Sequence, residues 1–407
     1  RVSGEEFMKS LSWLSNLKLR LSYGQTGNDN VSAYQTQGSI SGAKYYTFGS
    51  SESIGYVPNN LRNLDLGWER TTEYNVGLDF GFFNNRISGS VEYYNRLTED
   101  LIMNKTVPVT TGYSSVKANV GSVRNEGFEV NINSDNIRTK DFSWRTSLNF
   151  AYNKNKIVDL QYKENLTSRG LSLAGMSGDY SNLWIIGQPI DINYNLMTLG
   201  VWQLDEAEEA AKYFKDSKKT QPFKPGDIKL RDLNGDYIID DKDETYLGSQ
   251  SPKWTGGFNN NFSYKNFDLN VYIIARWGQM IDYELTGSYD PQGKGNFPAY
   301  LNYWTPENPS NDFPRPAQTN FYNYLGYQTL NYIDGSYWKI KTVSLGYTFP
   351  KSLTSKLGVS KLRAYVTANN LFSFAKNHLI QDYDAERGGS AKAPLQRQFI
   401  FGLNLDF

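Results

Sequence analysis

The sequence has no cysteine and a single histidine, and these two absences exclude much of enzyme chemistry. Without cysteine in 407 residues, neither a disulfide framework nor a thiol nucleophile is available. Because His378 is the only histidine, no histidine-based catalytic triad or multi-histidine metal site can be assembled. A carboxylate pair such as Asp382 and Asp384 would suit glycosidase chemistry, but acidic residues are common in loops. We therefore predict that the chain is not an enzyme.

The chain also lacks an excess charge and any long hydrophobic run. Its 42 basic and 42 acidic side chains balance, so no basic surface for nucleic acid is expected. No stretch is apolar enough to cross a membrane as a helix. Transmembrane β-barrels share this hydrophilic average, because half of each strand faces the lumen and the loops are polar. Aromatic residues make up 15% of the chain, including 30 tyrosines, and such rings suit the girdles of a barrel.

Apolar and polar residues alternate in many stretches, and the clearest of them ends the chain. In Arg397 to Phe407, five apolar residues recur at every second position: Phe399, Phe401, Leu403, Leu405 and Phe407. This period predicts a strand with one apolar face. Such a strand suits the core of a soluble sandwich or the lipid-facing side of a barrel, and the recurrence of the pattern along the chain favours the barrel.

The predicted fold class is therefore all-β, a transmembrane antiparallel β-barrel with long extracellular loops, to which this chain contributes about 12–14 strands. A complete smaller barrel is the alternative that this strand count also permits. The expected strands are Leu17 to Gln25, Glu73 to Phe80, Arg86 to Arg96, Gly127 to Ser134, Phe142 to Asn153, Asn195 to Trp202, Thr255 to Tyr264, Phe267 to Trp277, Tyr337 to Phe349, Leu362 to Phe372 and Arg397 to Phe407. Weaker candidates are Asp100 to Val107, Leu183 to Ile186 and Gln328 to Tyr332. The polar stretch Thr26 to Arg62 is expected to be a long, irregular surface loop.

Residues 204–246 are predicted to be a loop insertion that contains a helix and a candidate calcium site. Asp205 to Lys219 is acidic at its start and basic at its end, as the helix dipole favours. The oxygen ligands of an EF-hand-type loop would be Asp232, Asn234, Asp236, the carbonyl of Ile238, Asp240 and Asp243. Tyr237 stands where that loop prefers glycine, and Asp243 replaces a bidentate glutamate. The alternative is a solvated turn without metal. Calcium, if bound, would have a structural role.

Residues 282–332 are predicted to be a second extracellular loop, rich in proline and aromatic residues. Rigid aromatic loops form stacking platforms for sugar rings or grip a peptide, because rings offer contact area at little entropic cost. The candidate ligand-binding rings are Tyr300, Tyr303, Trp304, Phe321, Tyr322 and Tyr324. The alternative is that the same rings fill a small core of the loop itself.

Several stretches resemble blocks of one protein family. They are Asn63 to Ile102 (NLDLGWERTTEYNVGLDFGFFNNRISGSVEYYNRLTEDLI), Asn119 to Asn131 (NVGSVRNEGFEVN), Pro225 to Asp243 (PGDIKLRDLNGDYIIDDKD), Ser336 to Pro350 (SYWKIKTVSLGYTFP), Leu362 to Phe372 (LRAYVTANNLF), residues 382–386 and the terminal strand. Through these blocks, which are distributed from residue 63 to the end of the chain, it resembles the barrel of SusC/RagA-type TonB-dependent transporters of the Bacteroidetes outer membrane.

The resemblance implies a large outer-membrane barrel, plugged by an N-terminal domain, that imports oligosaccharides or peptides. It also implies energy from TonB–ExbB–ExbD and a SusD-like surface lipoprotein that meets the extracellular loops. Barrels of this kind close with about 22 strands, so residues 1–407 are expected to be the C-terminal part of one. The chain begins at Arg1 without a methionine, and we expect a missing N-terminal region that carries the plug and the TonB-contacting segment.

Three function classes stay open at this point. The chain is part of an importer, a structural or adhesive barrel without transport, or a secreted β-rich carbohydrate-binding protein. In the importer, the alternation of residues directs polar side chains away from lipid. The candidate lumen residues are Lys18, Arg20, Glu73, Asn75, Arg145 and Asn149.

Overall fold

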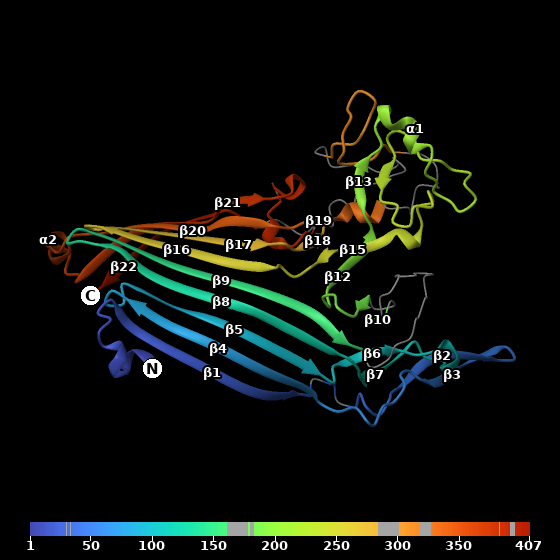
Figure 1. Cartoon of the computed structure of the whole chain (residues 1–407), viewed down its shortest axis with the longest axis horizontal. Coiled ribbons are helices and arrows are strands. Elements are labelled where there is room, and N and C mark those ends of the chain that lie inside the picture. Colours follow the sequence, from blue (N-terminus) through green and yellow to red (C-terminus); the bar gives the residue numbers. More distant parts are fainter. Residues whose placement is uncertain are drawn as a thin grey trace.

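Ten long strands form one antiparallel sheet in the computed structural model (Figure 1). Each strand pairs with the next long strand along the chain, so the sheet is a simple meander. In spatial order, the strands are β1 (Leu14–Asn28), β4 (Glu69–Phe82), β5 (Ile87–Glu99), β8 (Ser122–Arg138), β9 (Phe142–Asp159), β16 (Trp254–Tyr264), β17 (Phe267–Trp277), β20 (Tyr337–Thr348), β21 (Lys361–Ala375) and β22 (Gln398–Asp406). The structure describes residues 1–29, 31–32, 34–160, 178–179, 183–283, 301–316, 327–381, 383–390 and 395–407.

The two ends of the sheet differ in their connections. At the end that also holds both termini, on the left of Figure 1, neighbouring strands are joined by short segments. The turn between β4 and β5 places Phe83, Asn84 and Asn85 at φ values of 55°, 58° and 59°, a conformation that asparagine tolerates better than most residues. At the opposite end the connections are long, and they carry all six of the small strand pairs in the described residues.

The pairing register gives the sheet one apolar and one polar face. Leu19 lies opposite Leu78, and Leu21 lies opposite Val76, so apolar side chains from adjacent strands form continuous rows. These rows are exposed to the surroundings, with Leu21 at 70% and Phe401 at 81% relative exposure. The residues between them, such as Lys18 and Arg20, project from the other face. The terminal strand follows the predicted alternation, because Phe399, Phe401, Leu403 and Leu405 share the apolar face.

The number of strands in the main sheet is lower than we predicted. All ten of its strands were expected, but Asn195 to Trp202 and the three weaker candidates lie outside it. The small pairs are β2 (Ile40–Phe48) with β3 (Ser51–Pro58), β6 (Ile102–Thr106) with β7 (Ser115–Asn119), β10 (Gly178–Asp179) with β11 (Trp184–Ile185), β12 (Ile192–Leu196) with β15 (Glu244–Ser249), β13 (Thr198–Val201) with β14 (Ile228–Leu230), and β18 (Met280–Asp282) with β19 (Tyr332–Asp334). Short β-prone stretches within the long connections thus pair with one another.

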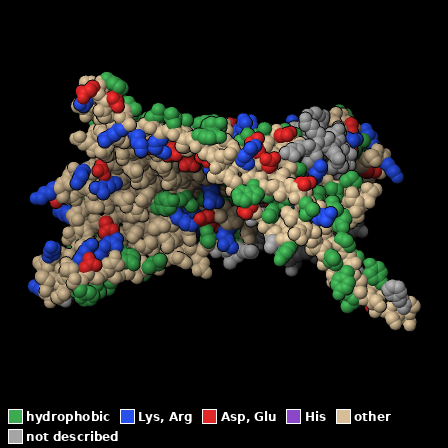
Figure 2. Space-filling model, turned by 90° about the horizontal axis from the view of Figure 1, so that it is seen from below, with side chains coloured by type: hydrophobic (Ala, Val, Ile, Leu, Met, Phe, Trp, Pro, Cys, Tyr) green, Lys and Arg blue, Asp and Glu red, His purple; other side chains and the backbone are tan. Residues whose placement is uncertain are grey.

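Two further expectations need correction. The stretch Thr26 to Arg62 is not wholly irregular, because β2 and β3 form a hairpin that projects beyond the sheet (Figures 1 and 2). Tyr45, Ile54 and Tyr56 are exposed on this arm. The stretch Gln328 to Tyr332 lies mostly in a 3-10 helix, η8 (Tyr327–Asn331), and not in a strand.

Helices are few and short in the described residues. The α-helices are α1 (Ala207–Ala210) and α2 (Lys351–Thr354). The 3-10 helices besides η8 are η1 (Val2–Gly4), η2 (Glu6–Met8), η3 (Val109–Thr111), η4 (Leu204–Glu206), η5 (Asp241–Asp243), η9 (Ser355–Leu357), η10 (His378–Ile380) and η11 (Ala385–Arg387). Among the described residues, no helix has the length and hydrophobicity needed to span a membrane.

Candidate functional site: a charged inner wall and an outer lobe

The polar face of the sheet carries paired charges that come from successive strands. Arg20 on β1 donates to Asp79 on β4 at 2.9 Å through Nη2, and it also pairs with Glu92 on β5. Nearer the long loops, Arg96 pairs with Glu73 at 2.7 Å. Arg145 on β9 pairs with Asp135 on β8 at 2.7 Å. The six predicted lumen residues all belong to this face, because each alternates with the apolar rows. We call this face the inner wall.

The inner wall is hollowed where the strands approach the long loops. One cavity of about 240 Å³ is lined by polar residues that include Asn75, Glu92, Tyr94 and Glu129. A neighbouring cavity of about 580 Å³ includes Ser22, Thr71 and Thr98, and both cavities reach Glu73, Arg96 and Asn125. The Tyr94 hydroxyl donates to Asn153 Oδ1 at 2.9 Å. Basic and acidic side chains gather along the hollowed part of the surface (Figure 2). This wall can therefore hydrogen-bond to a polar polypeptide or solute.

The connection between β21 and β22 packs onto this wall at the end with the long loops. Lys339 on β20 is fully buried and contacts Asp384 at 2.5 Å and Glu386 at 3.0 Å. Lys341 adds a second contact to Glu386 at 2.6 Å. Of the carboxylate pair considered for catalysis, Asp384 is thus engaged in an ion pair, and Asp382 lies outside the described residues. His378 is exposed, and its Nε2 lies 3.3 Å from Asp312.

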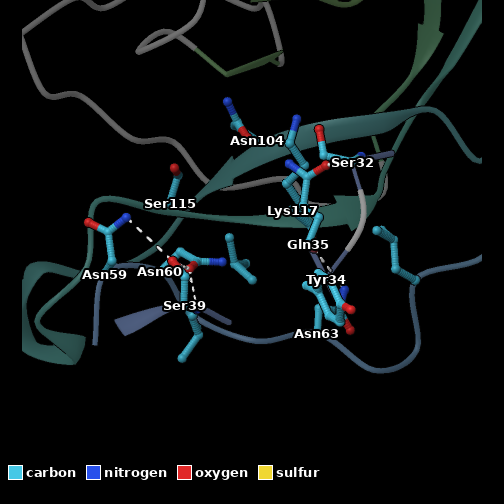
Figure 3. A pocket seen from close by; sticks show the side chains of 13 residues that line it. Ser32, Tyr34, Gln35, Ser39, Asn59, Asn60, Asn63, Asn104, Ser115 and Lys117 are labelled. Atoms are coloured by element: carbon cyan, nitrogen blue, oxygen red, sulfur yellow. Dashed lines mark hydrogen bonds between the residues drawn. The ribbon is translucent and has the colours of Figure 1, made fainter. Parts of the chain in front are cut away.

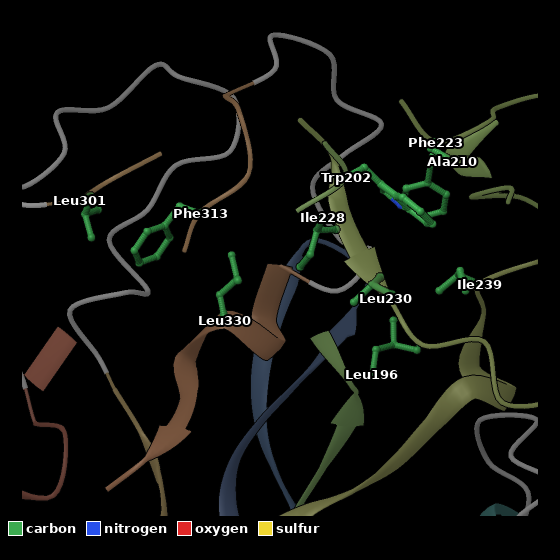
Figure 4. Close-up of a cluster of buried hydrophobic side chains, with 10 residues drawn as sticks. All are labelled: Leu196, Trp202, Ala210, Phe223, Ile228, Leu230, Ile239, Leu301, Phe313 and Leu330. Atoms are coloured by element: carbon green, nitrogen blue, oxygen red, sulfur yellow. The ribbon is translucent and has the colours of Figure 1, made fainter. Parts of the chain in front are cut away.

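The two predicted insertions pack together into one unit beyond the end of the sheet. Residues 196–239 and 301–316 share a hydrophobic cluster, and we call these residues the outer lobe. The buried members of the cluster, which includes Leu330 from η8, are Leu196, Trp202, Ala210, Phe223, Ile228, Leu230, Ile239, Leu301, Phe313 and Leu330 (Figure 4). We call the contact between these two segments the seam of the outer lobe. Across it, Trp304 Nε1 donates to Gln203 Oε1 at 2.9 Å, and the Arg315 amide donates to the Gly226 carbonyl at 2.8 Å.

A buried group of three charges lies at the same seam. Lys215 contacts Asp227 at 2.5 Å, and Arg315 contacts the other oxygen of Asp227 at 3.1 Å. The Lys224 amide also donates to Asp227, at 2.9 Å. Lys215 and Asp227 are almost fully buried, whereas Arg315 is partly exposed. Burial lowers the pKa of the Lys215 ammonium to about 8, although its contact with Asp227 acts in the opposite direction.

The predicted helix from Asp205 to Lys219 is wrong in its length. Only η4 and α1 are helical, and the basic residues at positions 215, 218 and 219 follow the helix. The reason is tertiary pairing. The Phe214 amide donates to the Tyr237 carbonyl at 2.8 Å, and the Ile239 amide donates to the Phe214 carbonyl at 2.9 Å. These bonds draw the backbone of Phe214 out of a helical path and bury Lys215 next to Asp227.

The candidate calcium loop is a compact turn whose side-chain oxygens accept backbone hydrogen bonds. Asp232 accepts from the amides of Gly235 at 2.7 Å and Tyr237 at 2.9 Å, and Asp236 accepts from Ile238 at 2.8 Å. Asp243 is buried and accepts from Leu233 and Asp240. Burial raises the pKa of the Asp243 carboxyl. Tyr237 has a φ of 62°, the left-handed conformation for which glycine was expected.

Calcium binding by this loop stays a prediction. Within the described ranges, no three acidic or histidine side chains form a group that can hold a metal ion. Of the other predicted ligands, Asn234 accepts from the Asp236 amide at 2.9 Å, and Asp240 accepts from Lys242 at 2.9 Å. The loop therefore has the hydrogen bonds of a self-supporting Asx-type turn.

The predicted aromatic platform is only partly described. Trp304 is buried in the seam of the outer lobe at 4% exposure, so this ring fills the core of the loop and does not offer a stacking face. Tyr303 is 39% exposed, and its contact with a ligand stays a prediction. The predictions for Tyr300, Phe321, Tyr322 and Tyr324 fall outside the described residues.

Sequence reasoning missed a polar pocket between the first long loop, which is the connection from β1 to β4 (residues 29–68), and the β6–β7 hairpin. Its volume is about 360 Å³, and its lining includes Gln35, Asn59, Asn60, Ser115 and Lys117 (Figure 3). The only signal in the sequence was the local density of asparagine, serine and glutamine. Such density is also typical of solvated loops, so it does not identify a pocket by itself.

Comparisons with known proteins agree with this architecture. The family model described as "TonB dependent receptor-like, beta-barrel" matches residues 9–371. TonB-dependent receptor P3 of Formosa agariphila is 33% identical over 430 residues, which cover 100% of this chain and 41% of that protein. TonB-dependent receptor SusC of Bacteroides thetaiotaomicron is 30% identical, with 100% of this chain and 39% of SusC covered. The chain thus spans about two fifths of the length of these relatives.

A solved structure of a transporter has a similar fold. The structure of the RagAB peptide transporter matches 100% of this chain and 42% of the compared chain, with a TM-score of 0.75 and 25% identity. The matching length, the open ten-stranded sheet and its two-sided character all indicate a portion of a larger barrel. The chain belongs to the TonB-dependent receptor β-barrel family, and its fold is similar to that of part of the RagAB peptide transporter.

Proposed function

We propose that this chain is the C-terminal wall of an importer that brings oligosaccharides or peptides across the outer membrane with energy from TonB–ExbB–ExbD. The observation that carries the proposal is the division of the ten-stranded sheet into an exposed apolar face and a charged inner wall. An apolar band toward lipid and a polar lumen are what a transport barrel needs. The apolar band also argues against the alternative of a secreted carbohydrate-binding protein.

The residues of the chain have distinct roles in this proposal. The paired charges of the inner wall, among them Arg20 with Asp79 and Arg96 with Glu73, hold the plug domain of the complete protein through polar contacts. Cargo passes when the plug moves, so the function is gated diffusion and not bond chemistry. The outer lobe lies at the extracellular end and offers a folded surface to a SusD-like lipoprotein. The names of SusC and of the RagAB peptide transporter support an importer but leave both cargo classes open.

The first experiment measures the native polypeptide and its associates. The full-length protein is purified from outer membranes in detergent, and its intact mass, N-terminal sequence and co-purifying lipoprotein are determined. We expect a chain more than twice as long as 407 residues, which begins with a plug domain. A native chain that starts at Arg1 would contradict the single-chain importer.

Uptake then separates an importer from a structural or adhesive barrel. Cells that carry the full-length gene are supplied with labelled oligosaccharide and peptide mixtures, with TonB present or deleted. Uptake of one mixture that requires both the barrel and TonB supports the proposal. If accumulation is the same without the barrel, the barrel is structural or adhesive.

A further inference from the structure

The polar pocket between the first long loop and the β6–β7 hairpin has a lining suited to one class of ligand. Gln35, Asn59 and Asn60 contribute carboxamides, Ser115 contributes a hydroxyl, and Lys117 contributes the only charge among the described lining residues (Figure 3). The volume of about 360 Å³ falls within the range of about 300–1,000 Å³ that is common for small-molecule sites. The pocket lies outside the hollow of the inner wall, so it is a separate site.

Hydrogen bonds fix both sides of this pocket in place. Asn60 Oδ1 accepts from the Ser39 amide at 2.7 Å, which holds two parts of the first long loop together. Asn63 Nδ2 donates to the Lys117 carbonyl at 2.8 Å, which ties the loop to the hairpin. At the end of β7, the Gly67 amide donates to Asn119 Oδ1 at 2.6 Å, which is a second bond between the loop and the hairpin. A ligand therefore meets a preformed site and loses less free energy to ordering of the loops.

The same bonds orient the polar groups of the lining. Because Asn60 and Gln35 use their oxygens to accept from the amides of Ser39 and Ser32, their amide nitrogens are left as donors. The Asn59 carboxamide donates to Ser39 at 3.4 Å and keeps its oxygen as an acceptor. The pocket thus offers neutral donors and acceptors side by side. Sugar hydroxyl groups, which both donate and accept, match this arrangement.

An exposed aromatic ring stands beside these groups. The Tyr34 side chain is 81% exposed and belongs to the lining. A tyrosine ring offers a rigid apolar face with a polar tip, and the apolar face of a sugar ring stacks on such a surface. Given this ring and the neutral amides, we infer that the pocket binds a neutral oligosaccharide.

A peptide fits the same pocket less well. Peptides are commonly held by addition to the free edge of a sheet. Here the Lys117 carbonyl on the edge of β7 already accepts from Asn63, and both polar atoms of the Asn119 side chain are bonded to Gly67 at 2.6 Å and 2.9 Å. In addition, the described lining has no carboxylate to match a basic residue or an amino terminus.

The test measures binding to the purified full-length protein in detergent, without transport. Calorimetry is carried out with neutral hexasaccharides built from glucose, mannose, galactose or xylose, and with a mixture of short peptides. At least one hexasaccharide should bind, and the double variant Gln35→Ala/Asn59→Ala should weaken that binding about tenfold, because two hydrogen-bonding groups are lost. Tyr34→Leu should weaken it as well, whereas Tyr34→Phe, which keeps the ring, should retain most of it.

Gln37→Ala is the matched control, because Gln37 is an exposed amide on the same loop that does not line the pocket. It should leave binding unchanged. The inference is overturned if no hexasaccharide binds at millimolar concentration, if the peptide mixture competes equally, or if the pocket variants bind as the parent does. Since uptake is not measured, the outcome is independent of whether the protein is an importer.

Discussion

Asp227 is the residue on which the seam of the outer lobe depends most directly. It accepts from Lys215 and Arg315 at 2.5 and 3.1 Å, and both cations lie in or next to the interior. Asp227→Ala would leave these charges without their shared carboxylate, and breaking a buried ion pair typically costs about 3–5 kcal/mol. We expect the local opening free energy of the outer lobe to fall by about that amount, measured by hydrogen exchange on the full-length protein. Glu208→Ala, an exposed change in the same insertion, should have little effect.

Lys215, which pairs with Asp227, predicts that the opening free energy of the outer lobe depends on pH in the alkaline range. Burial lowers the pKa of Lys215 to about 8, whereas a lysine in an unfolded chain titrates near about 10.4. Between these values the opened lobe binds a proton that the closed lobe has released, so the opening free energy should rise as the pH increases from about 8 to about 10. Hydrogen exchange, corrected for the intrinsic rate at each pH, measures this slope. Lys215→Met should remove it, and a flat profile in the parent protein would contradict the assignment.

The position of a single residue was predictable where the alternation along a strand determines which face it lies on. It was not predictable where the tertiary fold brings distant residues together. Alternation alone placed Lys18, Arg20 and Glu73 on the polar face. The contact between Asp227 and Arg315 joins residues 88 positions apart, and no local pattern connects them. Trp304 was a candidate for ligand contact because it is aromatic, but only the packed lobe shows that its ring is buried against Gln203 and Gly226.

Among the elements, the strands make the sharpest prediction, because adjacent residues face opposite environments. Val91 on β5 lies in the apolar row between Leu78 and Val130, whereas Ser90 lies on the inner wall between Asp79 and Asn131. Val91→Lys would place an ammonium in lipid, at a cost of about 2–4 kcal/mol near the midplane. We expect Val91→Lys to reduce the amount of folded barrel in outer membranes, measured by heat-modifiable migration on gels.

Ser90→Lys is the control for that substitution. It adds the same charge to the same strand but directs it toward Asp79, so folding should be nearly unchanged. Equal loss of folded barrel in both variants would mean that the apolar row does not face lipid.

The acidic turn from Asp232 to Asp243 gives a second prediction at this scale. If the turn binds calcium, millimolar Ca²⁺ should slow hydrogen exchange of the turn amides in the full-length protein, and a chelator should reverse the effect. Asp236→Asn keeps an acceptor for the Ile238 amide but removes a charge, so it should abolish the response to calcium while it preserves the turn. Protection that does not change with calcium would support the metal-free turn.

Elements were predictable to the extent that local pattern and tertiary pairing agree. The ten long strands follow a period of two and pair with their neighbours in sequence, so their existence was correctly predicted. The helix beyond Ala210 was not, because Phe214 pairs with residues near position 238 and this pairing outweighs helix propensity. The hairpin of β2 and β3 was missed because glycine, serine and asparagine around it resemble an irregular loop.

For the molecule as a whole, the outer lobe should behave as one cooperative unit although it comes from two distant insertions. Gly226 lies at the seam with a φ of 85°, and a Cβ there would lie 2.5 Å from both Arg315 Cδ and the Trp304 ring. Gly226→Ala should therefore separate the insertions. We expect limited proteolysis of the full-length protein to cut in both insertions at similarly increased rates.

Gly187→Ala is the matched control, because Gly187 has a φ of 87° and open space around its Cα. Gly187→Ala introduces a similar backbone strain, because the φ is positive at both positions, but its added Cβ does not clash with a neighbour. The rate of proteolytic cleavage should therefore change much less. Faster cleavage confined to residues 204–246 in the Gly226 variant would show that the insertions open separately.

The sheet ends in two strands, β1 and β22, that have no further strand beside them in the described residues. Each therefore presents a row of backbone donors and acceptors along one side. In hydrocarbon every such group that stays unpaired costs several kcal/mol, so this sheet cannot enter the bilayer first and find its neighbours afterwards. In the proposed barrel, insertion into the bilayer and pairing of the two edge strands with their neighbours have to proceed together. We therefore expect biogenesis of the proposed barrel to depend on a factor that shields these two edges until both are paired.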